Sequence, residues 1–167
     1  MPGARLITIG GARQVRDLAA DLRRERDNEI NDRLRRELAD VARPVAAAVR
    51  ASVRATPSKG QTARRGRRSL RSKIARATEV KVRTTRRPTV LVWVNPAAMP
   101  PGEKNLAGYL DGRRPFNRWR HQTFGHRPWV TQQPHPYFDR ATRQAAPAAE
   151  RATARVAETI SKEIARG

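Results

Sequence analysis

The chain has 167 residues, the length of one domain, which leaves little room for a two-domain enzyme. It contains 36 Lys and Arg against 15 Asp and Glu, a formal net charge of +21 that would attract DNA, RNA, an anionic membrane surface or an acidic protein ring. It contains no cysteine, which excludes disulfide scaffolds, thiolate zinc sites and thiol catalysis.

The apolar residues available for a core are few. Hydrophobic residues make up 38% of the chain, but 26 of them are alanines that bury little surface. A thin core is commonly supplemented by contacts between subunits, so the composition favours an oligomer or a member of a larger assembly. No window approaches the length of a membrane span, and the first residues do not have the pattern of a signal peptide, so we expect no membrane partner.

The first elements predicted are a short strand and a long helix. Residues 5–9 indicate a strand that stops at Gly10 and Gly11. Residues 12–56 predict one long helix or two stacked pieces, because the stretch 23–29 is hydrophilic, and Pro44 predicts a kink or break near residues 40–43. The apolar positions step by three and four along one helical face: Val15, Leu18, Leu22, Ile30, Leu34, Leu38, Val41, Val45, Val49 and Val53.

Residues 57–69 predict a mobile basic loop. Between Pro57 and Pro88 there are twelve Lys or Arg and one acid, which is about half of the total charge excess. Clustered cations release counterions when they meet nucleic acid, so this region could contact DNA or an acidic partner; a solvated loop is the alternative. The candidate contacts are Arg64, Arg65, Arg67, Arg68, Arg71 and Lys73.

The second half of the chain predicts a hairpin followed by two helices. Residues 74–84 alternate and residues 89–94 are rich in β-branched side chains, so the two segments should pair antiparallel. Residues 103–110 indicate a short helix stopped by Gly112, and a final helix begins at Pro136 and bends at Pro147. The sequence therefore predicts a single α+β domain over 1–167, with a long N-terminal helix, a small antiparallel sheet around a central hairpin, and a C-terminal helix.

Catalytic signatures are missing from the sequence. The histidines His121, His126 and His135 lie close together with Asp139 nearby, but their spacing matches no zinc pattern, so we interpret them as hydrogen-bonded or interface histidines. No nucleophile motif is found, and the long stretch between Glu79 and Asp139 holds only two acids. We expect a protein that is not an enzyme and that binds no cofactor and no metal.

One segment resembles a known family. The sequence reads Trp-Arg-His-Gln-Thr-Phe-Gly over 119–125, Trp-Val-Thr-Gln-Gln over 129–133 and Pro-Tyr-Phe over 136–138. This pattern resembles the tail-component proteins of long-tailed phages, especially those of actinobacteria, which are described as head-tail connector, neck or tail-completion proteins. The resemblance covers most of the chain and is tightest from about residue 106 to 141. The arginine loop and the hydrophilic insert near Asp27 depart from the family pattern.

The resemblance implies a structural virion protein at the junction of head and tail. It implies a homo-oligomeric ring, for which six copies is one option, that touches neighbouring connector and tail-tube proteins and surrounds the DNA channel, after assembly in the host cytoplasm. The competing hypothesis is a free basic nucleic-acid-binding protein. The residues expected to dock on a subunit or partner are Trp119, His121, Phe124, Gly125, Trp129, Gln132, Pro136, Tyr137 and Phe138.

The aromatic residues of this segment have a physical interpretation of their own. Trp119, Phe124 and Trp129 lie in a Gly- and Pro-punctuated segment without helical period, so they should hold a capping loop on the sheet or on a neighbouring subunit. Ordinary core filling is the alternative. If either tryptophan is buried in a core, its replacement by Ala should cost about 3 to 5 kcal/mol.

Overall fold

The computed structural model describes residues 28–57, 69–84, 89–112, 119–123 and 126–165. The predicted strand 5–9, the first part of the predicted N-terminal helix and the predicted loop residues 58–68 lie outside these ranges. The elements, in chain order, are α2 (Asn28–Ala55), α3 (Leu70–Ala77), β1 (Thr78–Arg83), β2 (Thr89–Val94), the 3-10 turn η1 (Pro96–Ala98), α4 (Leu106–Asp111), β3 (Trp119–Thr123), β4 (His126–Gln132) and α5 (Tyr137–Ile164). This is the predicted α+β fold.

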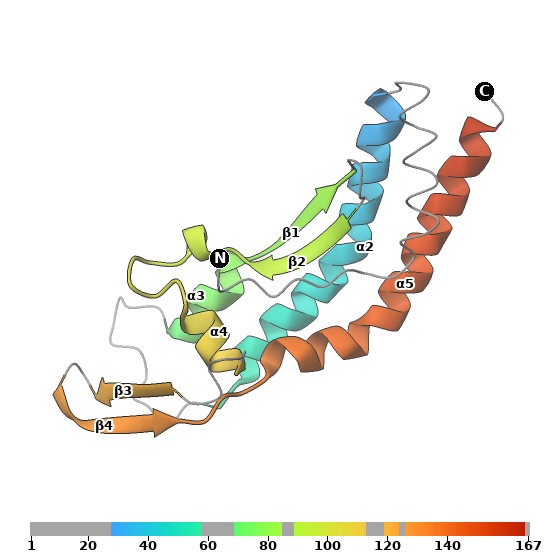
Figure 1. Ribbon diagram of the computed structural model, residues 1–167. Coiled ribbons are helices and arrows are strands. Elements are labelled where there is room, and N and C mark those ends of the chain that lie inside the picture. The colour runs from blue at the N-terminus through green and yellow to red at the C-terminus, as the bar shows by residue number, and fades with distance from the viewer. Residues whose placement is uncertain (1–27, 58–68, 85–88, 113–118, 124–125, 166–167) are drawn as a thin grey trace.

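Helix α2 is the centre of the fold and lies between the β1–β2 hairpin and α5 (Figure 1). Its predicted apolar face is the buried face: Leu34, Leu38, Val45, Val49 and Val53 are at most 2% exposed. The helix runs through Pro44 without the predicted break. Pro44 is exposed, so its ring faces solvent, and burial of the opposite face on two sides stabilises the helix against one lost hydrogen bond.

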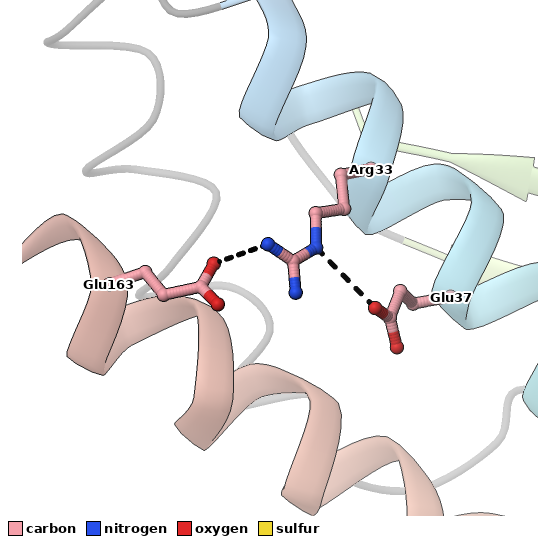
Figure 2. A network of polar contacts seen from close by, with 3 residues as sticks. All are labelled: Arg33, Glu37 and Glu163. Carbon is pink, nitrogen blue, oxygen red and sulfur yellow. Dashed lines mark hydrogen bonds and ion pairs between the residues drawn. The ribbon is translucent and has the colours of Figure 1, made fainter.

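Helices α2 and α5 form an antiparallel pair. At one end, Arg33 of α2 donates a hydrogen bond of 2.8 Å to Glu163 of α5 and lies 3.5 Å from Glu37 of its own helix (Figure 2). At the other end, the Ser52 hydroxyl donates to the Tyr137 carbonyl at 2.9 Å. Alanines on the buried face of α5, such as Ala149 and Ala157, allow the two helices to approach closely.

Each helix of this pair contains a proline at a similar level. Counted from the Arg33–Glu163 contact towards the Ser52–Tyr137 contact, Pro44 lies 11 of 19 residues along α2 and Pro147 lies 16 of 26 residues along α5, about six-tenths of the way in both. Figure 1 shows that α5 changes direction along its length, as a proline inside it predicts.

The predicted central hairpin is present with a shorter first strand. Strands β1 and β2 pair antiparallel with Val80 opposite Val92, as the alternation indicates. Residues 74–77, however, were predicted as strand and form the end of helix α3. Ser69 caps that helix by accepting a hydrogen bond from the Ser72 amide at 3.2 Å, a local contact that outweighs the β-like alternation of the next residues.

Residues 119–132 correct a second prediction. They were expected to form a capping loop, and they form a separate two-stranded antiparallel sheet, β3–β4. The predicted short helix is confirmed as α4, which ends at Gly112 in the left-handed region with φ of 76°. Among the residues that the structure describes, no helix is long and apolar enough to cross a membrane.

Candidate docking hairpin

The β3–β4 hairpin projects from the body of the molecule, away from the β1–β2 sheet and from most of the α2–α5 pair (Figure 1). No other described element packs extensively against it. Within the described residues its two strands pair only with each other, so each strand has one edge with unpaired backbone groups. The hairpin therefore has faces and edges available to a neighbour.

Both faces of the hairpin are exposed. Trp129 is 48% exposed and Val130 is 42% exposed, and they are the exposed large apolar residues of the part of the chain that the structure describes. Consecutive residues of a strand point to opposite faces. One apolar side chain is therefore open to solvent on each side, and a two-stranded hairpin without a covered face is marginally stable in water.

The backbone near the tip of the hairpin is irregular on the β4 side. Thr123 is opposite His126 and Gln122 is opposite Trp129, so β4 holds two more residues, Arg127 and Pro128, between these pairs. A proline has no amide hydrogen for the ladder and is tolerated at such an irregularity. Bulges of this kind reorient the following side chain, and here that side chain is Trp129.

The indole of Trp129 is held by a cation. The guanidinium carbon of Arg120, an exposed residue of β3, lies 5.5 Å from the centroid of the Trp129 ring. Arg120 is opposite Thr131 in the register, so it reaches the tryptophan across a diagonal of the sheet. A cation–π contact at an exposed site contributes about 0.5 to 1 kcal/mol. It limits the rotamers of an indole that no core encloses.

The base of the hairpin is anchored by α4. The His135 amide donates a hydrogen bond of 2.6 Å to the Leu110 carbonyl, directly after the end of β4. Gly112 passes close to Pro134: a Cβ on Gly112 would lie 2.6 Å from the proline Cβ, nearer than side chains tolerate. With its left-handed φ, this position needs glycine on two grounds.

Asp111 joins the same anchor to the start of α5. Pro136 precedes that helix and offers no capping side chain. The Asp111 carboxylate, 5% exposed, accepts a hydrogen bond of 2.9 Å from the Phe138 amide instead. This contact satisfies one of the first amide hydrogens of α5 and places a negative charge at the positive end of the helix dipole.

The structure separates the predicted docking residues into groups. Trp119 and His121 lie in β3, with backbones opposite Gln132 and Val130, and Trp129 and Gln132 are exposed on β4. Phe124 and Gly125 lie outside the described residues, and Pro136 is exposed at the start of α5. Tyr137 and Phe138 require a correction, because they are 3% and 1% exposed and form part of the chain's own core. They support the hairpin and have no free surface for a partner.

The predicted basic contacts are also divided. Arg64, Arg65, Arg67 and Arg68 lie outside the described residues. Arg71 donates a hydrogen bond of 2.5 Å to the Thr56 carbonyl beyond the end of α2, and Lys73 forms an ion pair of 2.6 Å with Glu103. Both were predicted to meet DNA or an acidic partner, and both have intramolecular partners that hold α3 in place.

Three functional residues were not predicted as such: Arg120, Val130 and Asp111. The alternation of residues 129–132, preceded by Phe-Gly, is a hairpin signal from which the exposure of Val130 could have been inferred. The roles of Arg120 and Asp111 depend on contacts across the chain. Within the described residues, no group of three His, Asp or Glu side chains could hold a metal ion.

Comparison of the chain with models of protein families, with curated proteins and with solved structures finds no match.

Proposed function

We propose that this chain is a non-enzymatic structural subunit of the head-tail connector of a long-tailed phage, in the neck or tail-completion ring. The observation that supports this most is the anchored β3–β4 hairpin, which presents Trp129 on one face and Val130 on the other. Such an arm is stable once a neighbour covers it. The family resemblance of the same segment gives the setting.

In this proposal the hairpin docks on a neighbouring subunit of a homo-oligomeric ring or on an adjacent connector or tail-tube protein. Tryptophan and arginine dominate the energetic centres of protein interfaces, and Trp129 with Arg120 forms such a pair. Residues 113–136 contain five arginines and no acid, so the partner surface should be acidic around an apolar pocket. The protein works in the virion, after assembly in the host cytoplasm.

The competing proposal is a free basic nucleic-acid-binding protein. The net charge of +21 favours it, but it gives no role to a two-sided hairpin with an exposed tryptophan. Molecular mass in solution separates the two proposals. A ring or a partner-bound species supports the connector, whereas a monomer that binds DNA with submicromolar, steeply salt-dependent affinity supports the competitor.

The main test is assembly. Without this protein, filled heads and finished tails should accumulate without joining. The double variant Trp129→Ala, Val130→Thr should reproduce that defect while it melts close to the wild type, because both side chains are exposed. Lys81→Ala, an exposed change on the other hairpin, is the matched control and should assemble normally. Infectious particles that lack the protein, or that form normally with the double variant, would overturn the proposal.

A further inference from the structure

A row of arginines follows the outer face of α5. Arg140, Arg143, Arg151 and Arg155 are all exposed, and in an ideal helix they fall within an arc of about 120°. That arc is opposite the buried face that contains Phe138, Ala149 and Ile160. We call these four arginines the α5 arginine row.

The α5 arginine row has no partner within the described part of the chain. The arginines of α2 behave differently. Arg33 and Arg43 pair with acids at 2.8 and 2.7 Å, and Arg50 donates a hydrogen bond of 2.6 Å to the Thr78 carbonyl. The helices carry similar side chains, but those of α5 remain free to bind an anion.

Beyond the row, the next cation on this face of α5 is already used. Lys162 donates a hydrogen bond of 2.7 Å to Glu158, and this bond, together with the lysine charge, lowers the pKa of the Glu158 carboxyl. The free cations therefore end at Arg155. From Arg140 to Arg155 the row spans 15 residues, about 22 Å of helix, which matches about six base pairs of a duplex.

We propose that the α5 arginine row binds the phosphate backbone of nucleic acid. The described surface of α5 has no exposed large apolar side chain, since the two found in the described chain, Trp129 and Val130, belong to the hairpin. A protein interface needs an apolar or aromatic centre, whereas nucleic-acid interfaces are polar and strongly positive. Guanidinium groups bind phosphate oxygens in pairs, without regard to base sequence.

This inference deepens the proposed function and rests on it for its setting, a channel that carries DNA. It gives the molecule two separate surfaces: the hairpin for protein and the outer face of α5 for nucleic acid. It also moves the expected DNA contact from Arg71 and Lys73, which are bound within the chain, to the α5 arginine row.

The experiment uses the full chain and a fluorescent 30-base-pair duplex, with anisotropy measured between about 0.05 and 0.2 M salt. Replacing the four arginines of the row by Gln lowers the net charge from +21 to +17. We expect a 10- to 100-fold loss of affinity at the highest salt and a fall of about 3 to 4 in the slope of log affinity against log salt. Replacing them by Lys should lose less, because the charge remains while the paired hydrogen bonds do not.

The matched control removes four other exposed cations, again giving +17: Arg36→Gln, Arg43→Gln, Arg54→Gln and Lys81→Gln. It should change affinity less than about threefold, because these residues do not form one row. Equal losses in both variants would mean that only net charge matters and would overturn the inference. So would a wild-type affinity in the row variant, or a loss confined to a loop variant with Gln at Arg64, Arg65, Arg67 and Arg68.

Two further readouts make the result unambiguous. Thermal denaturation of each variant checks that the binding loss is not unfolding. Binding of polyglutamate in place of DNA tests an acidic protein as the ligand, and loss of polyglutamate binding with DNA binding unchanged would overturn the inference. Because assembly is tested through Trp129 and Val130, failure of the DNA experiment leaves the connector proposal separately testable.

Discussion

The β3–β4 hairpin and the α2–α5 pair differ in where their apolar side chains lie. In the helical pair, one face of each helix is almost fully buried, with Leu38 and Ile160 at most 1% exposed. In the hairpin, Trp129 and Val130 remain open on opposite faces. The helical pair can fold on its own contacts, whereas the hairpin reaches full stability only with a neighbour. This difference separates the part that supports from the part that docks.

The sharpest way to break this comparison is to truncate one large aromatic in each region. Phe138→Ala should lower the free energy of unfolding by about 3 to 5 kcal/mol, because it empties a fully buried site between α5 and α2. Trp129→Ala should cost about 1 kcal/mol or less in the isolated chain, since the indole is half exposed. Chemical denaturation of both variants checks this, and equal losses would show that the hairpin is part of the core.

A smaller effect is expected at the connection between the two regions. Asp111→Ala should destabilise the chain by about 1 to 2 kcal/mol, because the Phe138 amide loses its acceptor and α5 loses its cap. Asp111→Asn keeps an acceptor oxygen and should lose less. Thermal melting of the pair, with the near-ultraviolet signal of the tryptophans followed separately, tests whether the hairpin loosens with the anchor. An Asn variant as unstable as the Ala variant would contradict the capping role.

The smallest effect is expected at the polar end of the helical pair. Arg33→Ala removes the contacts with Glu163 and Glu37, but all three side chains are about two-fifths exposed (Figure 2). We expect a loss of less than about 1 kcal/mol that shrinks further in high salt. Denaturation at low and high salt measures it. A larger loss that persists in salt would mean that polar contacts, as well as apolar packing, hold the helices together.

Much of the helical body could be predicted because its pattern is periodic. The steps of three and four in α2 identify its buried residues from Leu34 to Val53. The β1–β2 register follows from alternation. The boundary at residues 74–77 was mispredicted, because the Ser69 cap favours helix where the local pattern also suits a strand.

By itself, the sequence determined the α+β class, the buried face of each long helix, the central hairpin and the basic excess, since these depend on local periodicity and composition. Tertiary structure alone decided that residues 119–132 project as a second hairpin, that Tyr137 and Phe138 are buried while Trp129 is exposed, and which arginines are free. Two aromatics of one motif can have opposite fates because burial depends on neighbours distant in sequence. The same reason gives the arginines of α2 partners and leaves the α5 arginine row without them.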